Sequence, residues 1–200
     1  GAADFNAALA PDAPLPACET AIPAGALGAH YLARLHWLVE QVGGAPIQLA
    51  LSTAAELIRD HLRAGGRVFS GSFAHALPAE MSYRVRSPFL PLGIPRAADL
   101  RARTQPGDLL VFFGYIGLSN RYMDHGAWFR AAGLTLITSF VADPNPDNDA
   151  PDALVHIPQS WLPGDAEVPV PFPPGKMCPM SVINQLLLFR MLDERVAQLR

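Results

Sequence analysis

Lysine is almost missing from this 200-residue chain. Lys176 is the only lysine among 15 basic residues, and the others are arginines. The basic residues form no run, and the formal net charge is −3. Nucleic acids and anionic membrane surfaces are bound by clustered positive charge. The composition therefore excludes both as main partners of the protein.

Cysteines and long apolar runs are also scarce. Cys18 and Cys178 are too few for a disulfide framework, and we expect two free thiols. No apolar run reaches the roughly 18 residues of a membrane span, and no signal peptide is visible. We therefore expect a cytoplasmic protein. The chain begins with Gly1 rather than Met, which leaves a removed export signal before residue 1 as the alternative.

Histidines occur without the spacing of a metal site. The six histidines include no H-x-x-x-H pair and no His/Cys cluster. His30 and His36 are six residues apart, so they do not share one face of a helix. We expect no metal and no other cofactor. Among the histidines, His75 is the one that we expect to contact a ligand, because it lies at the start of a predicted helix.

The periodicity of the sequence divides the chain into an arm and one α/β domain. Residues 1–25 are rich in Ala and Pro and show no sustained period, which predicts an extended arm. Residues 26–200 alternate helical patterns with short apolar runs, and half of all residues are hydrophobic. This alternation predicts a five-stranded, mostly parallel sheet with helices on both faces, a Rossmann-like three-layer αβα sandwich.

The expected elements follow from spacing and from Gly and Pro. Because Pro78 is tolerated only in a first turn, the regular helix around it is expected to begin near Leu77. Helices are expected at Leu27–Val42, from Pro46 to about 63, at about 74–85, 95–104, 119–132 and 179–199. Strands are expected in "RVFSG", "FLPLGI", "GDLLVFFGYIG", "LTLITSFV" and "ALVHIP".

Three segments are expected at carboxyl ends of strands, where parallel sheets bind ligands. They are Ser70–His75, Gly114–Asn120 and Gly175–Ser181. Backbone N–H groups at a helix N-terminus attract anions, and serine hydroxyls add hydrogen-bond donors. The alternative for each segment is ordinary helix capping, since Ser is a preferred N-cap residue.

The order of these segments resembles the SIS (sugar isomerase) domain family over roughly residues 31–199. "AAELIRDHLRAGGRVFSGS" is similar to the family's helix and first strand, and "GDLLVFFGYIGLSNRYMDHGAWFRAAGLTLITSF" is similar to its second block. "LPGDAEVPVPFPPGKMCPMSVINQLLLFRML" resembles the tail of a phosphoheptose-isomerase-like subgroup. The resemblance implies a SIS-like fold, a sugar phosphate or related carbohydrate as ligand, and a homodimer or homotetramer.

The resemblance also implies a set of ligand contacts. They are expected from Ser70, Ser72, His75, Gly117, Ser119, Asn120 and Ser181. Phe73 and Ala74 depart from the subgroup, which usually carries a His-Ser pair at these places. Each neutral hydrogen bond lost costs about 0.5–1.5 kcal/mol, so phosphate binding is expected to be weakened.

Glu80 is the candidate catalytic base. Related isomerases place a carboxylate in a similar "AE" helix to move a proton between C1 and C2 of the open-chain sugar, so the resemblance implies aldose–ketose isomerisation. The alternative for Glu80 is an ion pair with Arg84 on the same helix. Phosphoheptose isomerases also use a His on the last helix, but this chain has none after His156, and Asn184 or Gln185 occupies that region. The second hypothesis is therefore a non-catalytic regulatory or structural SIS-like domain with a degenerate phosphate site.

Overall fold

The structure is a computed structural model of the chain. It describes residues 25–73, 77–83, 87–116, 119–120, 123–141, 153–161, 166–170 and 175–200. The expected ligand residues His75 and Gly117 lie outside the described residues, as does the expected arm apart from Gly25. The division of the chain at residue 25 therefore stays a prediction.

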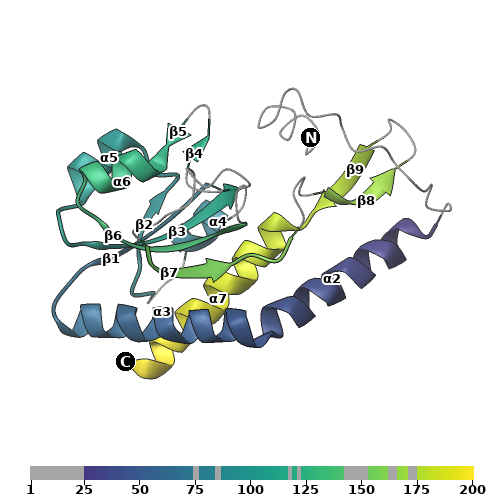
Figure 1. Ribbon diagram of the computed structural model, residues 1–200, viewed down its shortest axis with the longest axis horizontal. Helices are drawn as coiled ribbons and strands as arrows, with labels where there is room; N and C mark the ends of the chain where they lie inside the picture. The colour runs from purple at the N-terminus through teal and green to yellow at the C-terminus, as the bar shows by residue number, and fades with distance from the viewer. Residues whose placement is uncertain are drawn as a thin grey trace.

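A five-stranded sheet forms the centre of the molecule (Figure 1). Its strands are β1 Val68–Ser72, β2 Leu90–Gly93, β3 Leu109–Ile116, β6 Thr135–Val141 and β7 Ala153–Pro158. Their spatial order is β2-β1-β3-β6-β7, and each neighbouring pair is parallel. The predicted α/β class and its five strands are confirmed, and this sheet is parallel throughout.

Helices cover both faces of the sheet, which confirms the three-layer sandwich. They are α2 Leu27–Gly43, α3 Ala45–Arg63, α4 Leu77–Tyr83, α5 Ala97–Arg103, α6 His125–Ala131 and α7 Ser181–Leu199. In Figure 1, α3 and α7 lie on one face, and α5 and α6 lie on the other. The start of α4 at Leu77 agrees with the expectation from Pro78.

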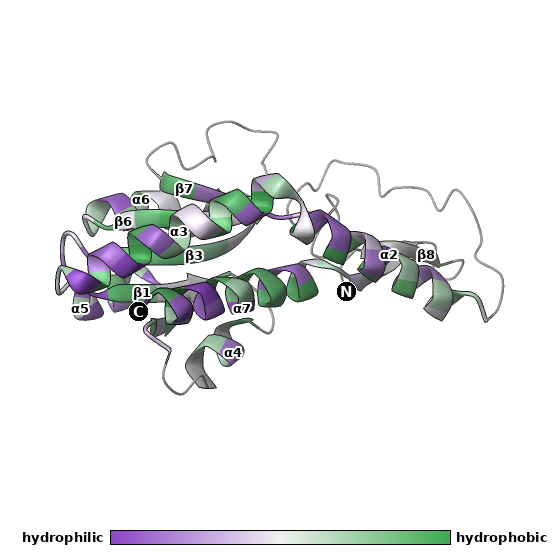
Figure 2. Cartoon of the chain, turned by 90° about the horizontal axis from the view of Figure 1, so that it is seen from below, coloured by the Kyte–Doolittle hydropathy of each residue, from purple (hydrophilic) through white to green (hydrophobic). Residues whose placement is uncertain are grey.

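Two hydrophobic clusters fill the space between the layers, because successive strand residues point to opposite faces. Phe113 of β3 faces α7 and meets the ring of Phe189 edge-on at 6.0 Å. Its neighbour Phe112 faces the other layer and meets Phe129 of α6 at 4.9 Å. The central strands are accordingly hydrophobic along their length (Figure 2). Burial on both faces explains why the β3 sequence is continuously apolar.

A short hairpin replaces part of the helix expected over 119–132. Strands β4 (Ser119–Asn120) and β5 (Met123–Asp124) pair antiparallel, and α6 begins only at His125. Asp124 fixes this boundary, since its carboxylate accepts a hydrogen bond of 2.9 Å from the backbone N–H of Ala127. Such a side-chain cap ends the extended chain and starts the helix.

A second hairpin occupies the Pro-rich tail. Strands β8 (Ala166–Val170) and β9 (Gly175–Pro179) pair antiparallel. The expected third ligand segment, Gly175–Ser181, is therefore mostly a strand and does not follow a strand of the parallel sheet. The hairpin lies next to α2, where the Tyr31 hydroxyl donates to the Pro179 carbonyl at 3.4 Å.

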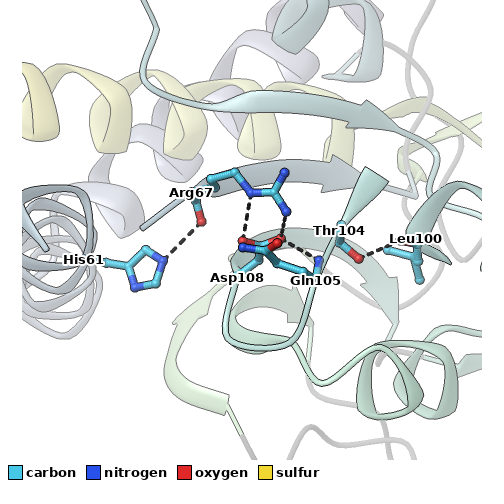
Figure 3. A network of polar contacts seen from close by, with 6 residues as sticks. All are labelled: His61, Arg67, Leu100, Thr104, Gln105 and Asp108. Carbon is cyan, nitrogen blue, oxygen red and sulfur yellow. Dashed lines mark hydrogen bonds and ion pairs between the residues drawn. The ribbon is translucent and has the colours of Figure 1, made fainter. Parts of the chain in front are cut away.

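The amino ends of β1 and β3 are joined by a partly buried ion pair (Figure 3). Arg67 donates to both carboxylate oxygens of Asp108, at 3.1 and 2.5 Å. Asp108 is 3% exposed and also accepts the backbone N–H of Gln105 at 2.8 Å. The ring of His61 contacts the carbonyl of Arg67 at 3.2 Å and ties α3 to the same corner. This ion pair fixes the register of two central strands at the edge opposite their carboxyl ends.

Candidate functional site at the carboxyl edge of the sheet

The strand order places a switch point between β1 and β3. From β1 the chain passes to the edge strand β2 and then returns to β3 on the other side of β1. The connections therefore leave these neighbouring strands in opposite directions, and α/β proteins bind ligands in the crevice at such a point. The backbone N–H of Phe73 donates to the Phe113 carbonyl at 2.9 Å and joins the two strand ends.

Ser70 and Ser72 place two hydroxyl groups on one face of β1. Both residues are fully buried, and neither hydroxyl has a hydrogen-bond partner among the described residues. The sequence predicted a strand that ends at Gly71 and placed Ser72 in the following loop. Because β1 pairs with β3 as far as Ser72 and Phe113, both serines belong to the strand. A buried hydroxyl without a partner costs about 1–3 kcal/mol. Two of them at a switch point suit a bound ligand better than packing.

The first turns of α7 reach the same edge. Ser181 is the first residue of the helix and is buried. One turn later, the side-chain oxygen of Asn184 accepts the backbone N–H of Ser160, just after β7, at 3.2 Å. The Asn184 amide nitrogen is buried and has no partner among the residues described. The expected ligand residue Ser181 therefore lies on a helix that holds the end of β7.

Two buried glutamines contact the carboxyl end of β3. Gln159 and Gln185 each donate their side-chain N–H to the carbonyl of Gly114, at 3.2 and 2.8 Å. The sequence had suggested that Asn184 or Gln185 occupies the place of the family's late histidine, but gave no role to Gln159. Its position directly after β7 is the signal that could have pointed to it. Residues that follow parallel strands lie together at the carboxyl edge of the sheet.

Ser119 and Asn120 follow β3 at this edge. Their backbones pair with Asp124 and Met123 in the β4–β5 hairpin. The structure thus brings five of the expected ligand residues onto elements that begin or end at the carboxyl edge: Ser70, Ser72, Ser119, Asn120 and Ser181. A role of each in ligand binding stays a prediction.

Glu80 is held by the last helix. Its carboxylate, 26% exposed, forms an ion pair with the guanidinium of Arg190 on α7. The sequence had offered Arg84 as the alternative partner, and Arg84 lies outside the described residues. Arg190 also lines an open hollow of about 460 Å³ along the second half of α7, together with Met191, Glu194, Arg195 and Gln198. This hollow is separate from the strand ends at the switch point.

Resolved pKa shifts in the described part of the chain belong to a single ion pair. This pair lies on α3, where a hydrogen bond from Arg59 lowers the pKa of Asp60 and that carboxylate raises the pKa of Arg59. Within the described ranges, no group of three or more His, Cys, Asp or Glu is placed to hold a metal ion. None of the helices in that part of the chain is long and apolar enough to cross a membrane.

Comparison with solved structures shows which known fold the chain shares. It is similar to the structure of a phosphoheptose isomerase from Francisella tularensis, with 14% sequence identity and a TM-score of 0.57. The match covers 86% of this chain and 96% of that one. At this identity the likeness shows the fold, which agrees with the predicted SIS-like sandwich. No protein-family model and no curated protein matches the chain.

Proposed function

We propose that the protein binds a sugar phosphate or a related carbohydrate derivative between the carboxyl ends of β1 and β3. The observation that carries this proposal is the pair of buried Ser70 and Ser72 hydroxyls, which have no partner among the described residues. A phosphate group offers several acceptor oxygens, and serine hydroxyls can donate to them. The fold shared with a phosphoheptose isomerase supports this class of ligand.

The described part of the edge offers uncharged groups for recognition of a ligand. The described residues at the switch point supply hydroxyls, side-chain amides and backbone N–H groups rather than a cluster of basic residues. Such groups suit the hydroxyls of a sugar as well as its phosphate. Phe73 and Ala74 stand where the resemblance implies imidazole and hydroxyl donors, so we expect modest affinity for the phosphate.

Two versions of this function differ in whether the site moves protons. In the isomerase version, Glu80 is the base that transfers a proton between C1 and C2. The ion pair of Glu80 with Arg190 favours the binding version, because it gives the carboxylate a structural role. The region of Asn184 and Gln185 offers amides, which do not shuttle protons near neutral pH. We therefore favour binding without isomerisation.

Thermal unfolding with matched ligands tests the proposal. A ligand that binds only the folded state raises the unfolding midpoint. We expect sugar phosphates at millimolar concentration to raise it and the matching unphosphorylated sugars to raise it less. If no sugar phosphate moves the midpoint, the proposed function is wrong.

Solvent deuterium distinguishes the two versions once a ligand is known. Proton transfer between C1 and C2 exchanges a carbon-bound hydrogen with solvent, which proton NMR of the sugar detects. We expect binding without such exchange. Exchange that is lost in Glu80→Gln would instead establish the isomerase version.

A further inference from the structure

Strand β3 contains one extra residue just before its carboxyl end. Phe113 pairs with Ser139 of β6, and the next pair joins Ile116 to Val141. Three residue steps on β3 thus oppose two on β6, which is the geometry of a β-bulge. A bulge leaves backbone groups out of the ladder and redirects the strand. Here it lies at the switch point, immediately before the chain leaves for β4.

The Gly114 carbonyl within this bulge is satisfied by side chains. Gln185 of α7 donates to it at 2.8 Å, and Gln159 donates at 3.2 Å. Gln159 also donates to the Ser139 carbonyl of β6 at 2.9 Å, so one amide group bridges the two strands where the ladder is interrupted. A carbonyl only accepts, which fixes the orientation of both side-chain amides.

The glutamines are themselves held in place. Gln159 is 8% exposed and Gln185 is fully buried. The indole N–H of Trp161 donates to the side-chain oxygen of Gln159 at 2.6 Å. The Trp161 ring in turn packs on Tyr115, the second residue of the bulge, with centroids 4.6 Å apart. The segment after β7 therefore contacts the bulge twice. It contacts the main chain of the bulge at Gly114 and a side chain of the bulge at Tyr115.

We propose that Gln159 and Gln185 are positioning residues that set the direction in which β3 enters the candidate ligand site. Their side-chain amides donate to the bulge carbonyl in place of backbone N–H groups. The direction of the chain after β3 therefore depends on the positions of α7 and of the segment after β7. The part of this inference that concerns ligand affinity rests on the proposed function. The part that concerns the backbone of β3 does not.

The test uses methionine variants of the full chain. Methionine has nearly the length of glutamine but cannot donate, so Gln185→Met and Gln159→Met each remove one donor from Gly114. Gln198→Met is the matched control, because Gln198 lies on the same helix and its side-chain amide donates to the exposed Glu194. Hydrogen exchange of backbone amides in peptides that span residues 109–120 reports the bulge, and peptides from β6 report the rest of the sheet.

We expect both glutamine variants to lose protection at residues 114–116. Protection of β6 should stay unchanged in Gln185→Met, and the control should behave like the unaltered protein. The dissociation constant of both glutamine variants for the sugar phosphate found by thermal shift is expected to rise about 5- to 10-fold, as for the loss of one hydrogen bond. If exchange at residues 114–116 does not change in either variant, the positioning role is wrong. If protection is lost but affinity is unchanged, the link to the ligand is wrong.

Gln185→Glu gives a readout that a purely structural role does not move. A neutral carboxylic acid can donate its O–H to the Gly114 carbonyl, whereas a carboxylate cannot. As the pH is lowered, this variant should regain amide protection at residues 114–116 and affinity for the sugar phosphate. Both quantities are compared with those of the unaltered protein at the same pH. A constant ratio across pH contradicts the proposal. If the unaltered protein binds no sugar phosphate, the proposed function fails, while the exchange data still decide the role of the glutamines.

Discussion

The carboxylate of Glu80 on α4 is paired with the guanidinium of Arg190 on α7. The pair joins the helix that follows the first candidate ligand segment to the last helix of the domain. Gln185 joins the same helix to the end of β3. Helix α7 is therefore the common support of two strand ends that meet at the switch point.

Replacing Glu80 separates a structural role from a chemical one. We expect Glu80→Gln to lower the free energy of unfolding by less than about 1 kcal/mol, because partly exposed ion pairs contribute little. Sugar-phosphate affinity should stay within about twofold by the same argument. Arg190→Gln is the matched control, since it removes the same pair from the other side. Thermal unfolding and ligand titration of both variants check this, and a loss of binding in Glu80→Gln alone would contradict it.

The buried serines of β1 should respond with opposite signs in the free and bound protein. Because their hydroxyls have no partner among the described residues, we expect Ser72→Ala and Ser70→Ala to leave the free energy of unfolding unchanged or to raise it by up to about 1 kcal/mol. The ligand-induced rise in the unfolding midpoint should shrink in the same variants.

Ser87 provides the matched control for those serines. Its hydroxyl donates to the buried carboxylate of Asp193 at 3.0 Å. Ser87→Ala should therefore destabilise the protein by about 1–3 kcal/mol and leave the ligand-induced shift intact. If Ser72→Ala behaves like Ser87→Ala, then the Ser72 hydroxyl stabilises the fold and is not reserved for a ligand.

The ion pair at the amino edge should affect stability alone. We expect Asp108→Asn to cost about 1.5–3 kcal/mol, because the bidentate bonds with Arg67 lose their charge. Urea unfolding measures this change, and ligand affinity should not follow it. Asp60→Asn is the control, since Asp60 is exposed and pairs with its neighbour Arg59. The lowered pKa of Asp60 means that its small contribution is present above its unfolded-state pKa and is lost as the pH falls through the folded-state value.

Two glycines should respond in opposite directions to the same substitution. Gly133 has a φ of +66°, and an added Cβ would lie 3.0 Å from a side-chain carbon of Pro106. Gly133→Ala should therefore cost at least about 1–2 kcal/mol. Gly28 lies within α2 with open space around it, so Gly28→Ala should stabilise the protein by about 0.5–1 kcal/mol. Equal midpoints for the two variants would show that the conformation at Gly133 carries no strain.

The expected homodimer or homotetramer has a direct test on the first two helices. Leu32 and Val39 of α2 and Leu49 of α3 are more than half exposed in the single chain. We predict that subunits associate through these side chains, since burial of apolar area drives association. Light scattering should give the mass of an oligomer for the unaltered protein and of a monomer for Val39→Asp. A monomer in both cases would contradict the prediction.

The sheet could be predicted because its signals are local. The continuous apolar run of β3 reflects burial on both faces, and Pro78 marks the beginning of α4 one residue earlier. The β4–β5 hairpin was missed because the apolar spacing over 119–132 also fits a helix. The beginning of α6 is set by the Asp124 side chain, which caps the helix at the backbone N–H of Ala127. The helical spacing of apolar residues does not reveal such a cap.

The contacts of Gln159 and Gln185 with Gly114 could not be predicted from the sequence. Gln159 and Gln185 are polar residues without a recognisable motif, although Gln185 lies directly before the apolar run "LLLF". Their role depends on a bulge in β3 and on the meeting of three segments at Gly114, which are features of the assembled fold. The serines of β1 were found from a family resemblance, but their burial became evident only with the strand pairing.

The position of Gln185 on the last helix has a consequence for synthesis. A ribosome releases α3, β1, β3 and β6 well before α7, so these strands wait with one face covered by α3 but not by α7, and with the Gly114 carbonyl lacking its Gln185 donor. The switch point can take its final shape only after the helix has left the exit tunnel and docked. A nascent chain that has folded its sheet therefore still lacks the complete candidate site.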